Sequence, residues 1–323
     1  MNNSIQDKLA LFTNNYQIIK NNFGLNNTLT KQMAAFLYAQ ADKTIDYEAI
    51  SQCLMLIKQN TGLFSFFRGH MTLCIATLLS LSSNPQDLLS KTLKVYDLLK
   101  SKKFRASLYL VITAYQIVSQ SKPSEYETVV TRTRAFYDGI KANHFFYTGQ
   151  DDNPFVAMLG QSDLDVVSGV ARVDKIYSQL KNNFRAKNSV QSLAQVLALS
   201  SENNMEHRVL ALSDALRTQK TKLDKTYTLP LLGILALLPT EIDVIVRAID
   251  ETQSILRTKK GFGMFSINKQ GLLLFVAALV ADEYAPESKD DVLTTTLSTS
   301  IMNIIIAQHN AIIIANSSSS SSS

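Results

Sequence analysis

Several features that mark other protein classes are scarce in this sequence of 323 residues. It has only 2 Cys, 11 Gly and 6 Pro, and no Trp. Few Gly, few Pro and few hairpin dipeptides argue against a fold of short strands joined by tight turns. The long apolar stretches GLLLFVAALVA and IMNIIIAQHNAIIIA are too short or interrupted, whereas a membrane span needs about 18 consecutive apolar residues. We therefore expect a helical protein without a membrane span.

Signals for secretion, cofactor binding and common catalytic chemistry are absent as well. The start MNNSIQDKLALF lacks a basic segment followed by a sustained apolar one, and two cysteines are too few for a disulfide framework. Both observations predict a reducing, cytoplasmic setting. There is no P-loop, GxGxxG, HExxH, GxSxG or CxxC motif. We therefore expect no cofactor, no metal site and, on balance, no enzymatic activity.

A pattern with a period near forty residues runs along the chain. An apolar-periodic segment closes on a basic residue seven times, at Lys20, Lys58, Lys100, Lys141, Lys181, Arg217 and Arg257. In most units an aromatic residue and then a more apolar helical segment follow. One helical hairpin cannot bury its own apolar faces, whereas stacked hairpins bury them jointly. The sequence therefore predicts about seven stacked helical hairpins.

The predicted fold is all-α, with tandem hairpins over residues 1–281 stacked as an α-solenoid-like array. Residues 282–315 are expected to form a linker and a capping helix, and residues 316–323 a disordered Ser-rich tail. The hairpins can stack as an open array with a concave face, or close into a ring, an α/α toroid, with the apolar second helices inside. We favour compact stacking without full closure.

The stretch HFFYTGQDDNP, from His144 to Pro154, has the strongest character of a site. His144, Asp151 and Asp152 could bind a divalent cation or act as an acid and base pair. A structural interpretation competes, because Asp152-Asn153-Pro154 is typical of a helix start with a capping side chain and Pro in the first turn.

The second hairpin carries further candidates. Arg68 and His70 occupy the turn equivalent to that of His144 and could hold a phosphate or carboxylate; alternatively, Arg68 stacks on a phenylalanine and His70 caps a helix. Cys53 and Cys74 come from the two helices of this hairpin. Without a convincing ligand set, we interpret them as small core residues rather than zinc ligands.

Cations recur at the same end of successive first helices, where stacking would align them as a basic rim. The rim residues are Lys100, Lys103, Arg105, Lys181, Arg185, Lys220, Lys259 and Lys260. Cations at helix C-termini each contribute about 0.3–1 kcal/mol through the helix dipole, which explains most of them structurally. The functional interpretation is a positively charged surface for nucleic acid or another acidic partner.

Longer strings suggest a family. LIKQNTGLFSFFRG with IATLLS, FRAS, and FYDGIKANHFFYTGQDDNPFVAMLG resemble a bacterial family of uncharacterised proteins, domain of unknown function 4003, from about Leu9 to Ala281. The resemblance implies a bacterial, mostly cytoplasmic helical protein and brings no activity. The hairpin number is also similar to that of lanthionine cyclases, whose zinc is held by a Cys and a Cys-His pair. Neither Cys53 nor Cys74 is followed by His, so that chemistry is not supported.

Two functional hypotheses follow. The first is a non-enzymatic helical-repeat protein that binds another macromolecule, an unknown protein or a nucleic acid, through a concave face or the basic rim. The second is an enzyme with a small-molecule or metal site at the rim of an α/α toroid, formed by Arg68, His70, His144, Asp151 and Asp152. The enzyme needs these side chains to converge in one pocket, whereas the binding protein needs an extended exposed surface.

Overall fold

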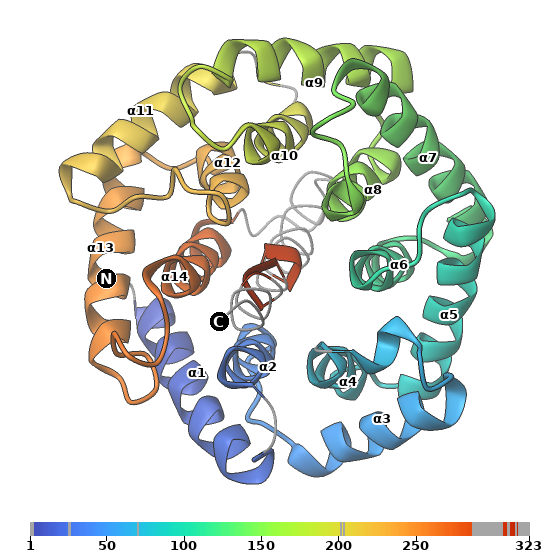
Figure 1. Ribbon diagram of the computed structural model, residues 1–323. Helices are drawn as coiled ribbons and strands as arrows, with labels where there is room; N and C mark the ends of the chain where they lie inside the picture. The colour runs from blue at the N-terminus through green and yellow to red at the C-terminus, as the bar shows by residue number, and fades with distance from the viewer. Residues whose placement is uncertain are drawn as a thin grey trace, which may run out of the picture.

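The computed structural model describes residues 3–24, 27–69, 71–200, 202, 204–285, 306–308, 311–313 and 315. All regular structure in these residues is helical, which confirms the all-α prediction. An outer layer consists of α1 (Asn3–Asn22), α3 (Tyr47–Asn60), α5 (Pro85–Ser101), α7 (Tyr126–Asn143), α9 (Val166–Leu180), α11 (Met205–Thr218) and α13 (Ile242–Thr258) (Figure 1). An inner layer consists of α2 (Thr28–Gln40), α4 (Thr72–Ser80), α6 (Leu108–Gln120), α8 (Asn153–Gln161), α10 (Lys187–Ala198), α12 (Leu229–Leu237) and α14 (Lys269–Tyr284).

The two layers follow from the distribution of apolar residues. The inner helix α14 is apolar on all sides, and every residue from Gly271 to Ala281 is buried. The outer helix α13 instead buries one stripe, with Ile245, Ile249 and Leu256 at helical spacing, and leaves its other side in water. A helix that is apolar all round must be enclosed, whereas an amphipathic helix can form the surface.

The inner helices all run in the same direction. Side-chain hydrogen bonds join the ends of α2 and α4 (Tyr38 with Ser80, 2.9 Å) and the ends of α6 and α8 (Gln116 to Gln161, 3.2 Å). At the other end, Gln32 near the start of α2 donates to the carbonyl oxygen of Gly261, just before α14 (2.7 Å). All turns from an outer to an inner helix therefore lie at one face of the ring.

We call this face the turn face; among the described residues it comprises 23–24, 27, 61–69, 71, 102–107, 144–152, 181–186, 219–228 and 259–268. The return turns form the opposite face, whose described residues are 41–46, 81–84, 121–125, 162–165, 199–200, 202, 204 and 238–241.

The first and last hairpins close the ring. The ring of Phe12 in α1 packs against Phe262 before α14 and against Phe275 within it, with centroid distances of 4.8 and 5.1 Å. Lys8 of α1 forms an ion pair with Asp282 of α14. The array is therefore the closed alternative rather than the favoured open one. An open array would leave Phe12 and Phe36 at an apolar free end, whereas the last hairpin covers them.

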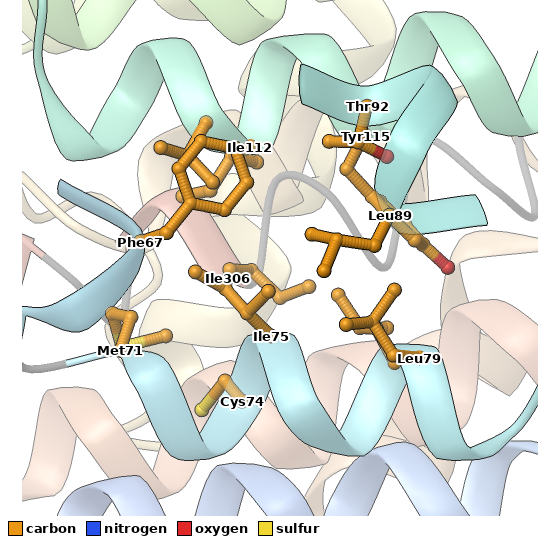
Figure 2. A pocket seen from close by; sticks show the side chains of 12 residues that line it. Phe67, Met71, Cys74, Ile75, Leu79, Leu89, Thr92, Ile112, Tyr115 and Ile306 are labelled. Atoms are coloured by element: carbon orange, nitrogen blue, oxygen red, sulfur yellow. The ribbon is translucent and has the colours of Figure 1, made fainter. Parts of the chain in front are cut away.

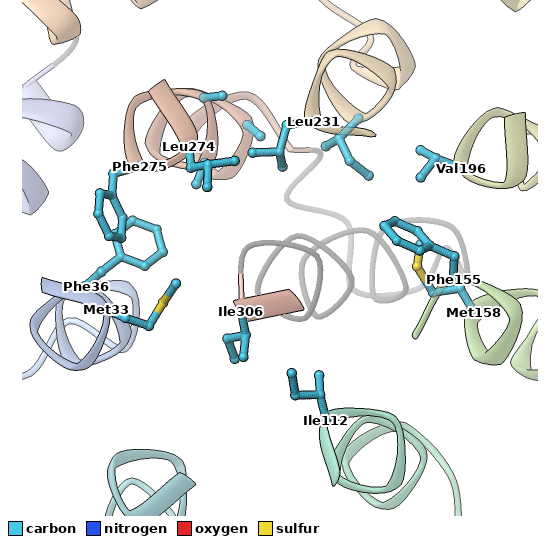
Figure 3. Packing of buried hydrophobic residues seen from close by; sticks show 14 of the residues in the cluster. Met33, Phe36, Ile112, Phe155, Met158, Val196, Leu231, Leu274, Phe275 and Ile306 are labelled. Atoms are coloured by element: carbon cyan, nitrogen blue, oxygen red, sulfur yellow. The ribbon is translucent and has the colours of Figure 1, made fainter. Parts of the chain in front are cut away.

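The chain itself occupies the centre of the ring. Ile306, Ile312 and Ile313 are buried, and Figure 3 shows Ile306 between side chains of the inner helices. An apolar cavity of about 20 Å³ remains beside Ile306, where α4, α5 and α6 meet (Figure 2). The inner face of the hairpins is thus packed rather than open. The predicted capping helix lies largely outside the described residues, and the Ser-rich tail wholly so.

Two arginines tie outer helices to inner ones in the same way. Arg132 of α7 donates hydrogen bonds to carbonyl oxygens 28, 30 and 32 residues further along the chain. Arg208 of α11 does so at the same three intervals. The accepting carbonyls lie at the ends of α8 and α12 and in the turns that follow, where a helix leaves its carbonyls unpaired.

The closure depends on a glycine. Gly261 has φ +94°, and a Cβ atom there would overlap the ring of Tyr16 in α1. We therefore expect Gly261→Ala to lower the free energy of unfolding by about 1–3 kcal/mol, because it strains the backbone and separates the first and last hairpins. Gly263 lies in the same turn with open space around its Cα. Gly263→Ala should change the stability by less than about 0.5 kcal/mol.

Urea unfolding of both variants and the wild type, followed by far-ultraviolet circular dichroism, measures the difference. Equal stabilities for the two variants would show that the close approach of α1 and the last turn does not hold the ring together.

Candidate functional site

A buried carboxyl lies where the turn face meets the inner layer. Asp152 ends the 3-10 helix η3 (Gln150–Asp152) and immediately precedes α8. Its Oδ2 accepts a hydrogen bond from the backbone N–H of Gly149 (2.8 Å). Its Oδ1 accepts from Nε2 of Gln191 and of Gln195 in α10, at 3.3 and 3.2 Å. The carboxyl therefore joins the turn before α8 to the next inner helix.

Further polar side chains surround this carboxyl. Oδ2 of Asp151 accepts a hydrogen bond from Nδ2 of Asn188 in α10 (2.8 Å). Tyr109, at the start of α6, has a raised pKa because of burial and the nearby Asp151, Tyr227 and Asp152. Tyr227 lies two residues before the start of α12. Side chains near the starts of four inner helices thus form one polar cluster at the turn face.

The environment of Asp152 favours its neutral form. Complete burial, with a smaller contribution from Asp151, raises its pKa to about 8, although the bonds from Gly149, Gln195 and Gln191 oppose the shift. Oε1 of Gln195 is buried and has no hydrogen-bond partner among the described residues. Because amide oxygen and nitrogen are interchangeable by rotation, turning this amide over would place Oε1 where a protonated Asp152 can donate to it.

The sequence predicted a helix start at this position, and that prediction is confirmed. α8 begins at Asn153, with Pro154 in its first turn. The Asp152 side chain makes no capping bond to α8, however, and instead holds the preceding turn and α10. Its exposed fraction is 0%, so it cannot touch a solute in this conformation.

The other predicted site residues have different surroundings. His144 ends α7, and its Nε2 lies 3.0 Å from Oδ1 of Asp174 in α9. Burial lowers the pKa of His144, and Asp174 opposes that shift. Arg68 donates to the carbonyl oxygens of Lys58 and Thr61, at the C-terminus of α3. His70 lies outside the described residues. Among the four of these residues that the structure describes, the contacts bring only Asp151 and Asp152 into the polar cluster.

The predicted basic rim lies at the turn face. Within the described residues its members are all exposed: Lys100, Lys103, Arg105, Lys181, Arg185, Lys220, Lys259 and Lys260. Lys100 pairs with Asp97 at 3.0 Å, and the other seven have no ion pair with a described residue. The turns of this face contain eleven Lys or Arg and three Asp, whereas the turns of the opposite face contain two Lys and seven Asp or Glu. The two faces therefore differ in the sign of their charge.

The sequence reasoning missed a set of exposed apolar side chains, which we call the apolar tips. They lie in three turns of the turn face and comprise Leu63, Phe64 and Phe66; Phe145, Phe146 and Tyr147; and Met264 and Phe265. In hairpin two, the phenylalanine that is buried is Phe67, which packs against Tyr96 of α5, whereas Phe64 is exposed. Adjacent bulky apolar residues in a Gly-containing turn are the signal that could have revealed the tips.

Other classes of site find no support in the described part of the chain. There, no three side chains of His, Cys, Asp or Glu are grouped so that they could hold a metal ion. Cys53 and Cys74 are unpaired and buried, and burial raises the pKa of both thiols, which makes them poor nucleophiles. No helix in that part combines the length and apolar character needed to cross a bilayer.

A closed double-layered ring of helical hairpins, with the inner helices starting at one face, defines the class of α/α toroids. The family model described as "Protein of unknown function (DUF4003)" matches residues 15–310, and the chain belongs to this family. The chain is 22% identical over 207 residues to a Bacillus subtilis (strain 168) protein described as "Uncharacterized protein YeaA"; the match covers 62% of this chain and 63% of that protein. No solved structure matches the chain.

The raised pKa of Asp152 makes stability depend on pH. Its folded pKa of about 8 lies above the usual value of 3.8, so the folded state binds the proton more tightly than the unfolded state does. The free energy of unfolding should therefore fall as the pH rises from about 4 to about 8. Asp152→Asn should remove this component, because an amide stays neutral throughout and the Gln195 amide can turn to match it.

Urea unfolding of the wild type and Asp152→Asn at about pH 5, 7 and 9 tests this expectation. With each increase in pH, the free energy of unfolding of the variant should rise relative to that of the wild type. A difference between the two proteins that stays constant from the lowest to the highest pH would contradict it.

Proposed function

We propose that this chain is a non-enzymatic binding protein whose turn face holds an acidic macromolecular partner. The observation that carries the proposal is the opposite sign of charge on the two faces of the ring. Eleven Lys or Arg stand against three Asp in the turns of one face, and two Lys against seven Asp or Glu in those of the other. On a chain with a formal net charge of only +5, this separation concentrates a positive potential on one side.

The helix dipole accounts for only part of this pattern. Cations are favoured at the ends of the outer helices, but a cation directly before the start of an inner helix is disfavoured by the positive end of that helix dipole. The exposed Arg185, for example, lies two residues before the start of α10 and makes no ion pair with a described residue. A surface for an acidic partner explains such cations better than helix stability does.

The concave-face alternative has less support. The inner helices pack against one another, and the buried Ile306 lies between their side chains (Figure 3). The turn face is therefore the extended exposed surface available to a large partner. Both cysteines are unpaired, which fits our further proposal that the protein acts in the reducing cytoplasm.

A second candidate function is enzymatic and rests on the polar cluster. A carboxyl with a pKa raised to about 8, near Tyr109 at the turn face, has the properties of an acid or base group. Its complete burial argues against this function, because a catalytic carboxyl must reach its substrate. We therefore place the binding function first.

Charge reversal on the two faces tests the binding function. Lys181→Glu/Lys260→Glu alters the turn face, whereas Lys43→Glu/Lys122→Glu alters the opposite face; all four lysines are exposed, and both pairs lower the formal net charge equally. Because each cation near an acidic surface contributes about 1 kcal/mol, we expect the turn-face pair to bind heparin at least roughly tenfold more weakly than the wild type. The opposite-face pair should bind nearly as the wild type does.

Heparin affinity across a series of salt concentrations provides the measurement, with circular dichroism to confirm folding. The wild-type affinity should fall steeply with salt, and less steeply in the turn-face pair. An affinity that is insensitive to salt, or equal losses in both pairs, would refute the proposed surface.

A further inference from the structure

The apolar tips are concentrated in an unusual way. Among the described residues, eight of the twelve exposed large apolar side chains lie in just three turns of one face. Phe64, Phe146 and Phe265 have exposed fractions of 101, 91 and 108%. A phenylalanine that is fully in water contributes nothing to the core, and single exposed apolar residues need no explanation. Three such residues at the apices of three turns on one face do need one.

The three tip turns are spaced around the ring. They belong to the second, fourth and seventh hairpins, at residues 61–71, 144–152 and 259–268, so at least one other hairpin separates each from the next. These turns have nine to eleven residues and turn 219–228 has ten, whereas turns 23–27, 102–107 and 181–186 have five or six.

Internal hydrogen bonds brace each tip turn. Arg68 binds carbonyl oxygens at the end of α3 and closes the first turn. Asp152 binds Gly149 within the second turn and two side chains of α10. Arg257 donates to the carbonyl oxygens of Phe262 and Ile267, at 3.2 and 3.1 Å, and so closes the third. Because the turns are held in shape, presenting their apices to a partner costs little ordering entropy.

Cations alternate with the tips around the same face. Lys103 and Arg105 lie in the turn between the first two tip turns, and Lys181 and Arg185 follow the second. Lys141 lies over the ring of Phe145, 5.5 Å from its centroid. Apolar side chains that enter the boundary of a bilayer, combined with cations at the level of its headgroups, are the two attractions that hold peripheral proteins on anionic membranes.

We propose that the turn face docks on the surface of an anionic lipid bilayer, with Phe64, Phe146 and Phe265 inserted and the surrounding cations on the headgroups. This inference rests on the proposed function and names its partner. A bilayer is laterally continuous and soft, so it receives three separated apices at once, whereas a protein would need three matched pockets. A nucleic acid duplex would use the cations but offers the phenylalanines no apolar site.

A triple substitution separates insertion from simple charge attraction. Phe64→Ala/Phe146→Ala/Phe265→Ala removes the apices and keeps every cation. The control, Met55→Ala/Val167→Ala/Val244→Ala, removes three exposed apolar side chains from the outer helices α3, α9 and α13. Flotation of the full chain with vesicles of phosphatidylglycerol and phosphatidylcholine should show at least about a tenfold loss of affinity for the tip variant. The control variant should bind as the wild type does, and vesicles of phosphatidylcholine alone should bind the wild type more weakly.

The lack of Trp in the sequence permits a direct test of insertion. Phe265→Trp places a single tryptophan at one apex, and Val167→Trp places one on α9 as a control. On addition of the mixed vesicles, the emission of the apex tryptophan should shift to shorter wavelength and be quenched by a bromine-labelled lipid. The control tryptophan should show neither effect.

The outcomes distinguish this inference from the proposed function. Vesicle binding that survives the loss of all three phenylalanines, without a shift at Phe265→Trp, would overturn membrane docking. So would binding of a DNA duplex or polyuridylate in place of vesicles; in both cases the proposed function stands if the heparin comparison succeeds. If the heparin comparison also fails, both proposals fall.

Discussion

The need to enclose seven helices that are buried on almost every side determines the form of this molecule. α14, for example, buries every residue from Gly271 to Ala281, which no single neighbour could achieve. Each inner helix needs an outer helix behind it and an inner helix on either side, and this condition can be met for all of them only if the first hairpin meets the last. The contacts of Phe12 with Phe262 and Phe275 join the first hairpin to the last and so fulfil this condition.

Because the ring is closed, residues that recur in each hairpin come to lie together on one surface. Because every hairpin is antiparallel and all inner helices point the same way, whatever recurs after an outer helix recurs at one face of the ring. Lys103, Lys181 and Lys260 are far apart in sequence but share that face. A modest excess of positive charge thereby becomes a strongly polarised molecule, and three unrelated turns bring their phenylalanines to the same side.

The hairpins could be predicted because their signals are local: a periodic apolar stripe, a closing cation and a polar or Pro-containing start. Closure could not, because the overlap of Gly261 with Tyr16 and the packing of Phe12 on Phe262 join opposite ends of the chain. The site could be predicted only in part, because some of its features are local in sequence and others are not. The helix start at Asp152 is a local pattern, but its partners Gln191 and Gln195 lie 39 and 43 residues away.

The bracing of the tip turns preserves the charge of the face. Arg68 and Arg257 bind carbonyl oxygens rather than carboxylates, so each closes its turn without losing its positive charge to a partner. Asp152 braces the remaining turn, and an ionised carboxylate there would subtract from the positive potential. Burial raises its pKa to about 8, which leaves it mostly neutral at pH 7. The three turns are thus held in shape at little cost to the attraction of the face for an anionic surface.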